Sequence, residues 1–296
     1  MRITYCLGFF VALSSCGDGQ PQTGPGSSLR DKRIAFTSDR DGDPNIFVMN
    51  ADGGGMVRLT SNPAVDQSPD WSPSPDGKIA FMSDRDGGDY DVYVILVNGR
   101  GLQQLTSNAT PDGFPSWSPD GSKILFTSAR DGNLELYVMG ADGTDQRRLT
   151  WNSVVDTGGD WSPDGSRIAF ASGGGDNQEI YVMQANGAVP VRLTNNTAFE
   201  GGRLAWSPDG SRIAFYSSRD GNFEIYVMNA DGTNPTRLTS DPAQDRHPAW
   251  SDDGLRIVFT TDRDGNDEIY AMNADGTGLT RLTNDPAQDF LASWQR

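Results

Sequence analysis

One segment recurs six times along this chain at a nearly constant distance. The sequence Trp-Ser-Pro-Asp-Gly, or a variant of it, begins at Trp71, Trp117, Trp161, Trp206 and Trp250, and Trp294 stands alone near the C-terminus. Successive tryptophans are 44 to 46 residues apart. An Ile-x-Phe segment follows the same period, with isoleucine at positions 34, 79, 124, 168, 213 and 257. A period of this length made of short β-type segments is typical of propeller blades, and no window shows the 3.6-residue apolar period of a helical repeat.

Each repeat divides into four short strands. In the fifth repeat we expect strands at 203–207, 212–217, 224–229 and 236–239, separated by turns that contain Asp-Gly pairs. Such pairs supply the positive φ angles that tight hairpins require. Across three of these turns we expect exposed ion pairs of Arg130 with Glu135, Arg219 with Glu224 and Arg263 with Glu268. Strand segments such as 225–228 are apolar on both sides, as expected when a sheet is packed on both faces. The sequence therefore predicts an all-β fold, a six-bladed β-propeller with four-stranded blades, in which the periodic tryptophans form the core between blades.

The two ends of the repeat array complement each other. The first repeat begins at residue 33 without a tryptophan strand before it, and residues 289–294 form a tryptophan strand with nothing after it. We expect the C-terminal strand to become the innermost strand of the first blade, which closes the ring and removes free sheet edges.

The charge of the chain excludes two classes of partner. There are 40 Asp plus Glu against 24 Lys plus Arg, a net charge of −16, and lysine occurs only three times, at Lys32, Lys78 and Lys123. Nucleic acids and anionic lipid surfaces are bound by clustered cations. We therefore expect no nucleic-acid partner and no direct binding to an anionic membrane surface.

The N-terminal residues resemble a signal peptide followed by a lipidation site. Residues 1–15 contain one arginine and an apolar run too short to span a bilayer, as in a signal peptide. Residues 13–16, Leu-Ser-Ser-Cys, resemble a bacterial lipobox, which implies lipidation of Cys16 after cleavage; an ordinary secretory signal is the alternative. Residues 16–30 are rich in Gly, Pro and Ser and are predicted to be a flexible tether. The predicted propeller then occupies residues 31–296, 266 residues or about 44 per repeat.

The full repeat resembles a known family. The pattern Asp-x-x-x-x-Trp-Ser-Pro-Asp-Gly-x-x-Ile-x-Phe, followed by Arg-Asp-Gly-Asn-x-Glu-Ile-Tyr-Val-Met-Asn-Ala-Asp-Gly-Thr and Arg-Leu-Thr, is similar to the propeller repeat of the TolB family of envelope proteins, over residues 31–296. TolB itself carries an α/β domain ahead of the propeller, for which residues 17–30 leave no room. The resemblance implies a bacterial extracytoplasmic propeller that binds other molecules.

A carboxylate precedes every periodic tryptophan by five residues, or by six in one repeat. The six residues are Asp66, Asp112, Asp156, Glu200, Asp245 and Asp289. At the start of the innermost strands they would form an axial ring at one mouth of the channel, where like charges cannot all remain ionised without compensation. Either each one caps backbone amides, or several share a hard cation such as Ca²⁺. The sequence predicts no required cofactor, with Ca²⁺ at the channel mouth as the alternative.

Two further features concern function. Aromatic residues in the variable loops are candidates for a binding face, although they could also tuck into blade junctions; they are Trp151, Phe114, Phe199 and Phe290. The chain has one histidine, His247, and no Gly-x-Ser-x-Gly segment, so no catalytic residues are predicted.

We therefore expect an exported, lipid-anchored propeller that is a monomer and faces the periplasm or the exterior. We expect it to bind an envelope protein or a cell-wall glycan without catalysis. The alternative is a carbohydrate-active enzyme, a lyase or hydrolase, that uses axial carboxylates and a divalent metal.

Overall fold

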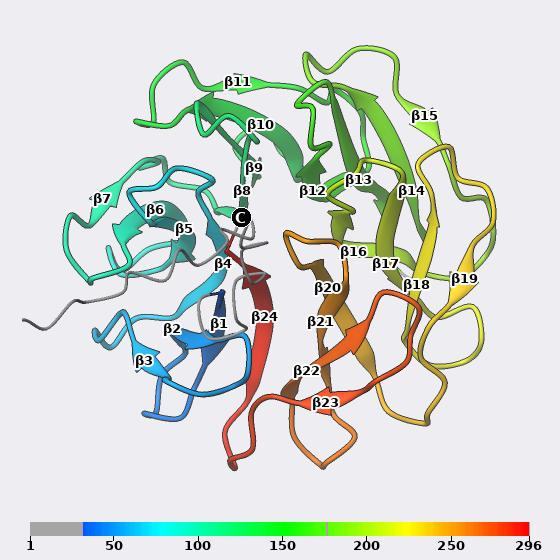
Figure 1. Ribbon diagram of the computed structural model, residues 1–296. Coiled ribbons are helices and arrows are strands. Elements are labelled where there is room, and N and C mark those ends of the chain that lie inside the picture. The colour runs from blue at the N-terminus through cyan, green and yellow to red at the C-terminus, as the bar shows by residue number, and fades with distance from the viewer. Residues whose placement is uncertain (1–31, 176, 296) are drawn as a thin grey trace, which may run out of the picture.

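The computed structural model describes residues 32–175 and 177–295, and these form a ring of six sheets around a central axis (Figure 1). Each sheet has four antiparallel strands, and no helix occurs in these two ranges. The predicted six-bladed β-propeller is confirmed. The predicted signal peptide, Cys16 and the tether lie outside the described residues.

The blades follow one another along the chain. From the innermost to the outermost strand, the first blade contains β24 (Asp289–Trp294), β1 (Arg33–Ser38), β2 (Asn45–Asn50) and β3 (Val57–Arg58). The second contains β4 (Asp66–Trp71), β5 (Lys78–Ser83), β6 (Asp91–Leu96) and β7 (Gln103–Gln104). The third contains β8 (Asp112–Trp117), β9 (Lys123–Ser128), β10 (Glu135–Gly140) and β11 (Arg147–Arg148).

The second half of the ring repeats this order. The fourth blade contains β12 (Val155–Trp161), β13 (Arg167–Gly174), β14 (Asn177–Gln184) and β15 (Val191–Arg192). The fifth contains β16 (Glu200–Trp206), β17 (Arg212–Ser217), β18 (Glu224–Asn229) and β19 (Thr236–Arg237). The sixth contains β20 (Asp245–Trp250), β21 (Arg256–Thr261), β22 (Glu268–Asn273) and β23 (Thr280–Arg281). In the fifth blade the second and third strands have the predicted bounds, whereas β16 begins three residues earlier than expected and β19 is two residues shorter.

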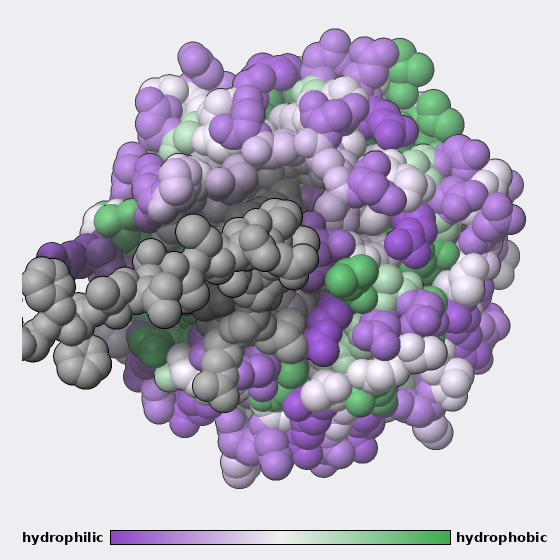
Figure 2. Space-filling view, in the orientation of Figure 1, coloured by the Kyte–Doolittle hydropathy of each residue, from purple (hydrophilic) through white to green (hydrophobic). Residues whose placement is uncertain are grey.

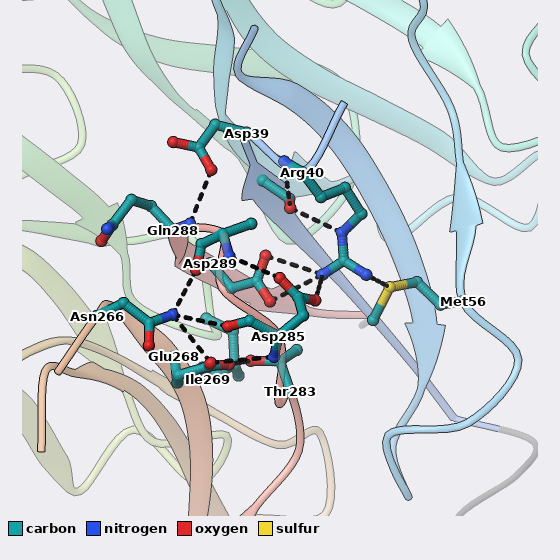
Figure 3. Close-up of polar contacts among 12 residues, drawn as sticks. Asp39, Arg40, Met56, Asn266, Glu268, Ile269, Thr283, Asp285, Gln288 and Asp289 are labelled. Carbon is teal, nitrogen blue, oxygen red and sulfur yellow. Dashed lines mark hydrogen bonds and ion pairs between the residues drawn. The ribbon is translucent and has the colours of Figure 1, made fainter. Parts of the chain in front are cut away.

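The ring closes between its first and last elements, as predicted. β24 pairs antiparallel with β1, with Ile34 opposite Trp294 and Ser38 opposite Asp289. Figure 3 shows the polar contacts at this seam: the guanidinium of Arg40 binds both oxygens of Asp289, at 2.9 and 2.8 Å, and the backbone N–H of Gln288 donates to Asp39 at 2.7 Å. Main-chain pairing and a buried ion pair therefore join the two ends of the chain.

Apolar side chains fill the spaces between neighbouring blades. Trp71 of the second blade, which is 1% exposed, belongs to a cluster with Ile46 and Val48 of the first. Five further clusters join successive blades around the ring in the same way. The interpretation of the periodic tryptophans as inter-blade core is confirmed.

Every innermost strand contains an irregularity that the sequence pattern did not reveal. The register of each shifts where it pairs with the second strand, and a residue near the shift has a left-handed backbone. These residues are Ser68, Phe114, Gly158, Gly202, His247 and Leu291, with φ between 52° and 70°. A β-bulge of this kind changes the direction of side chains along a strand, here along the wall of the central channel.

The face drawn in Figure 2 is mostly hydrophilic, and its hydrophobic residues lie in small separate groups, in keeping with the net charge of −16. In the part of the chain that the structure describes, no helix is long and apolar enough to cross a bilayer.

Candidate functional site

The six predicted ring carboxylates lie at the beginning of the innermost strands. All six residues are fully buried, with no exposed surface: Asp66, Asp112, Asp156, Glu200, Asp245 and Asp289. In the strand register each one lies opposite a serine or threonine of the second strand, such as Ser83 opposite Asp66. Burial of a carboxylate is costly unless it is paired and hydrogen-bonded, so the partners of these groups decide their role.

Five of the six carboxylates bind an arginine of their own blade. The arginine comes from the turn between the second and third strands, and its Nε donates to the serine or threonine opposite the carboxylate in each case. The pairs are Arg85 with Asp66 (2.8 Å), Arg130 with Asp112 (2.8 Å), Arg219 with Glu200, Arg263 with Asp245 (3.1 Å) and Arg40 with Asp289 (2.8 Å). The same guanidinium lies over aromatic rings of the blade, as Arg85 does over Phe81 and Tyr93.

The fourth blade departs from this arrangement. Its turn lacks the arginine, and the strands on either side of the turn, β13 and β14, are eight residues long instead of six. Asp156 accepts a hydrogen bond from the amide of Asn152 at 2.6 Å instead. Neutral donors therefore replace the arginine in this blade.

Burial raises the pKa of four ring carboxyls, while arginines and hydroxyl donors oppose the shift; these are Asp112, Asp156, Asp245 and Asp289. A raised pKa means that ionisation of these groups costs folding free energy, which is recovered when they are protonated at low pH. The arginine and hydroxyl contacts reduce that cost at neutral pH.

The arrangement of the acidic side chains bears on the alternative that several ring carboxylates share a metal ion. No three Asp, Glu, His or Cys side chains lie close enough to hold a metal ion within residues 32–175 and 177–295. A Ca²⁺ ion takes six to eight oxygen ligands, and at this ring it would have to displace arginines from several carboxylates. The contacts of the ring thus favour its role in holding the arginine turns to the innermost strands.

A different pairing within the hairpins was expected from sequence, and it is wrong. The proximity of Arg130 to Glu135 along the chain suggests an ion pair across the turn, as it does for Arg219 with Glu224 and Arg263 with Glu268. The glutamates bind arginines of the outermost strand instead: Arg148 with Glu135 (2.7 Å), Arg237 with Glu224 and Arg281 with Glu268 (2.8 Å). The third, fifth and sixth blades therefore each contain two layers of buried charge, which link the first strand to the turn and the third strand to the fourth.

A cavity of about 280 Å³ lies on the axis of the ring. Its wall includes Phe114, Trp206 and Trp250, and its polar lining includes Asp70, Asp160 and Arg203. The residues after the tryptophans also contribute to it, namely Pro73, Pro119, Pro163, Pro208 and Asp252. Since these residues belong to the turns between the first and second strands, the cavity lies toward the face that carries those turns, opposite the ring carboxylates.

Arg203 crosses the channel. It extends from β16 of the fifth blade, and its Nη2 donates to the carbonyl oxygen of Pro69 at 2.8 Å and to Asp70 at 3.2 Å, both in β4 of the second blade. In a ring of six, the second and fifth blades lie opposite each other. Its Nη1 donates to the carbonyl oxygen of Leu291 in the first blade at 3.3 Å. One side chain thus connects three blades through the centre of the molecule.

Asp70 and Asp160 also join blades. Asp70 accepts from the backbone N–H of Trp117 in the third blade at 2.9 Å, and Asp160 accepts from that of Trp206 in the fifth blade at 3.0 Å. Both residues directly precede a periodic tryptophan, and the sequence analysis did not predict their contacts with the next blades.

The contact of Arg203 with Asp70 was also not predicted. The sequence contains a signal for it, because Arg203 and Arg246 are the only arginines or lysines in the innermost strands.

The four predicted binding-face aromatics have different surroundings. Trp151 is 75% exposed in the loop between β11 and β12, with the guanidinium of Arg148 4.5 Å from its ring centroid. Phe114 lies in the wall of the axial cavity. Phe199 stacks on Tyr216 with centroids 5.3 Å apart, and Phe290 is half-buried in β24. Trp151 is therefore the most exposed of the four.

His247 is the third residue of β20, an innermost strand. Its ring packs edge-on against Tyr216 at 5.4 Å. Burial, together with nearby Arg246 and Arg203, lowers its pKa to about 3. The imidazole is therefore neutral at physiological pH.

Comparisons with known proteins agree with this architecture. The family model described as the TolB beta propeller domain matches residues 19–106 and 198–296, and the model of the Tricorn protease N-terminal beta propeller domain matches residues 88–175. The Tol-Pal system protein TolB of Anaeromyxobacter dehalogenans is 51% identical over 39 residues, 13% of this chain and 9% of that protein. The protein of the same name from Geobacter sulfurreducens is 35% identical over 73 residues, 25% of this chain and 15% of the relative.

Solved structures match over a larger share of the chain. TolB from Acinetobacter baumannii superposes with a TM-score of 0.79 and 26% identity, over 90% of this chain and 67% of that one. Hydrazine synthase from Kuenenia stuttgartiensis superposes with a TM-score of 0.74 and 18% identity, over 93% of this chain and 50% of that one, a likeness of fold alone.

Proposed function

Because this chain belongs to the TolB β-propeller family, we propose that it is a non-catalytic protein-binding module of the bacterial cell envelope. Its alignments with the curated relatives span only 9% and 15% of their lengths, so a role in the Tol-Pal system is part of the proposal. The proposed partner is an envelope protein, bound by a monomeric propeller. No cofactor is required, and Ca²⁺ at the ring would compete with the arginines.

Export and lipid anchoring belong to the same proposal. The signal-like residues 1–15 and the lipobox-like residues 13–16 support them from the sequence. Lipidation at Cys16 would hold the propeller at an envelope membrane, facing the periplasm or the exterior, through a tether of residues 16–30. The membrane contact would be made by the lipid, in agreement with the net charge of −16.

The exposure of Trp151 carries the proposal for the binding face. A tryptophan that is 75% exposed leaves a large apolar surface in water, and Val154 of the same loop is 41% exposed. Tryptophans and arginines dominate the energetics of protein interfaces, and Arg148 lies over this ring. The loop is on the face of the arginine turns, where the repeats differ most from one another.

Crosslinking in intact envelopes tests this proposal. We expect a Trp151→Ala variant to lose a specific crosslinked protein partner that the unchanged chain retains. Leu255→Ala is the matched control, since Leu255 is 67% exposed in a turn on the opposite face. A Cys16→Ser variant should leave the membrane fraction. If the unchanged chain and the Trp151→Ala and Leu255→Ala variants all gave the same crosslinks, the proposed binding face would be contradicted. Capture of glycan alone would contradict a protein partner.

A further inference from the structure

Five blades share one arrangement around the guanidinium group of their turn arginine. The group binds the ring carboxylate, its Nε donates to the hydroxyl opposite, and its face lies over an aromatic ring of the third strand. Arg130 contacts Asp112 at 2.8 Å and Ser128 at 2.7 Å, and its Cζ lies 4.8 Å from the centroid of Tyr137. Figure 3 shows the contacts of the corresponding Arg40. We call the carboxylate, the hydroxyl and the ring the guanidinium seat of a blade.

The fourth blade has the walls of this seat without the arginine. Asp156 is fully buried and lies opposite Ser172 in the strand register. Phe170 of the second strand stacks on Tyr181 of the third, with centroids 5.7 Å apart. Gly174 stands at the position of the arginine, two residues after the serine.

The exposure of Tyr181 indicates that this seat is open. Tyr181 is half-buried, whereas the rings at the same position of the other blades are only 3% to 8% exposed; these are Phe47, Tyr93, Tyr137, Tyr226 and Tyr270. A Cβ atom at Gly174 would meet no other atom within 4 Å. The space that an arginine side chain fills in five blades is therefore accessible to solvent in the fourth.

The polar groups of the open seat favour a cation. Asp156 has neutral donors, the amide of Asn152 and neighbouring hydroxyl groups. Glu179, which lies opposite Ser172 on the other side, is 3% exposed, and its Oε2 has no hydrogen-bond partner among the described residues. The guanidinium of Arg192 binds the other oxygen of this glutamate, at 2.6 Å. Buried carboxylates that lack a cation are costly, so a positive charge beside Asp156 would recover free energy.

The shape of the seat selects a guanidinium over an ammonium group. A guanidinium is planar, so it can donate to a carboxylate and a hydroxyl along its edge while its face lies on an aromatic ring. An ammonium is a compact and strongly hydrated charge that cannot make these contacts together. The five occupied seats of the same molecule all contain the planar group.

We propose that the fourth blade binds the guanidinium group of another molecule, which contacts Asp156 and the Ser172 hydroxyl and lies over Tyr181. The group could belong to a free guanidino compound or to an arginine side chain of a partner, and this second source rests on the proposed function. The seat adjoins the proposed binding face, because Asn152, whose amide binds Asp156 at 2.6 Å, directly follows Trp151 in the chain.

NMR titration of the full chain with three blocked amino acids tests the selectivity. N-acetyl-arginine methylamide carries the guanidinium, the citrulline compound is its neutral isostere, and the lysine compound carries an ammonium. We expect the arginine compound to bind at least about tenfold more tightly than either of the others, and to shift the ring resonances of Tyr181. Equal binding of the arginine and citrulline compounds, or no shift at Tyr181, would overturn the proposal.

Two glycine variants locate the binding. Gly174→Arg supplies the missing side chain from the chain itself and should abolish binding of the arginine compound. Gly88→Arg is the matched control, since a Cβ atom at Gly88 also meets nothing within 4 Å, and Arg85 already fills the seat of that blade. The control should bind as the unchanged chain does. Binding that survives Gly174→Arg would refute this location.

Neutral carboxylate variants keep the test independent of the glycine change. Asp156→Asn should weaken binding of the arginine compound at least about tenfold and keep the Tm, because no buried cation loses its partner. Asp112→Asn should lower the Tm, because Arg130 is left unpaired. An equal loss of Tm in both variants would mean that the chain already compensates Asp156, and the seat would not be open.

Crosslinking in intact envelopes distinguishes the two sources. Loss of the partner crosslink in Gly174→Arg would assign the guanidinium to an arginine of the partner, and a retained crosslink would assign it to a free guanidino compound. Trp151→Ala measures the binding face by itself. A failed titration would therefore overturn the seat and leave the proposed function standing.

Discussion

At the scale of single residues, the buried charged side chains are the most distinctive feature of this propeller. A carboxylate such as Asp66 has no exposed surface, yet an arginine and a serine of the same blade surround it. A buried ion pair adds little stability compared with an apolar pair, but loss of one partner leaves an uncompensated charge. The ring carboxylates therefore make the arginine turns necessary for the fold.

Replacement of Arg85 tests this dependence. The Arg85→Met variant keeps an apolar side chain over Phe81 and Tyr93 but leaves Asp66 buried without its cation. We expect the free energy of unfolding, measured by urea denaturation, to fall by about 3 to 5 kcal/mol. Arg100→Met, at an exposed site, should change it by less than about 0.5 kcal/mol.

A second substitution separates charge from packing. In Arg85→Met combined with Asp66→Asn, the buried group is neutral, and most of the lost stability should return. If the double variant is as unstable as the single one, the arginine acts through packing and not through its charge.

The partners of these charges could be predicted only in part. The spacing to the tryptophans, five residues in five repeats and six in the repeat of Glu200, located all six carboxylates, because every innermost strand is six or seven residues long. The arginine partners were assigned wrongly, since proximity along a hairpin pointed to Glu135, whereas the side chain of Arg130 turns back across the sheet to Asp112. Side-chain direction depends on the folded sheet and not on separation in the chain.

At the scale of the elements, the bulge in each innermost strand could not be predicted from the sequence. Its six residues share no type: a serine, a phenylalanine, two glycines, a histidine and a leucine have the same left-handed backbone. No composition signal could identify such a position. The strand therefore imposes the conformation, and the residue type is free to vary along the channel wall.

Gly158 permits a test of how closely the innermost strands approach. Its φ is +66°, and a Cβ atom there would lie 1.9 Å from the carbonyl oxygen of Gly202 in the next blade. Gly165, with φ +68°, has only Pro119 Cδ near it, at 3.8 Å. We expect Gly165→Ala to lower the free energy of unfolding by about 1 to 2 kcal/mol for its backbone alone. Gly158→Ala should cost about 1 to 3 kcal/mol more, because two strands must move apart.

Chemical denaturation of both variants measures this difference. Equal losses would show that the two strands can separate at no cost, and the close packing at the channel would then have no role in stability.

At the scale of the molecule, the architecture could be predicted almost completely. Six equal repeats, strand patterns that are apolar on both sides and complementary chain ends leave one arrangement that buries every sheet face. The contents of the channel could not be predicted in the same way. Arg203 occurs in one repeat only, and its contacts with Pro69 and Asp70 join residues more than 130 positions apart. Contacts across the axis depend on the ring having formed.

Closure of the ring makes the whole molecule depend on its last strand. Without residues 289–296, β1 would become an open edge, and Arg40 would lose its contacts with Asp289. The cluster that contains Trp294, 3% exposed, would also open to water. Loss of a buried tryptophan alone costs about 3 to 5 kcal/mol, and each kcal/mol lowers the Tm of a chain of this size by about 2 to 4 °C. We therefore expect the truncated chain to melt at least about 10 °C lower, or without a cooperative transition, in differential scanning calorimetry.

A chain that ends at Trp294 is the matched control, since among the described contacts it loses the hydrogen bond from the Gln295 N–H to the Arg33 carbonyl, 2.8 Å in length. It should melt close to the full chain. A synthetic peptide of residues 285–296, added to the truncated chain, should restore much of the lost Tm, because the strand joins the ring without a covalent link to the first blade. An unchanged melting profile after truncation would mean that five complete blades and a three-stranded first blade carry the stability by themselves, and that the seam between β24 and β1 is not what holds the ring together.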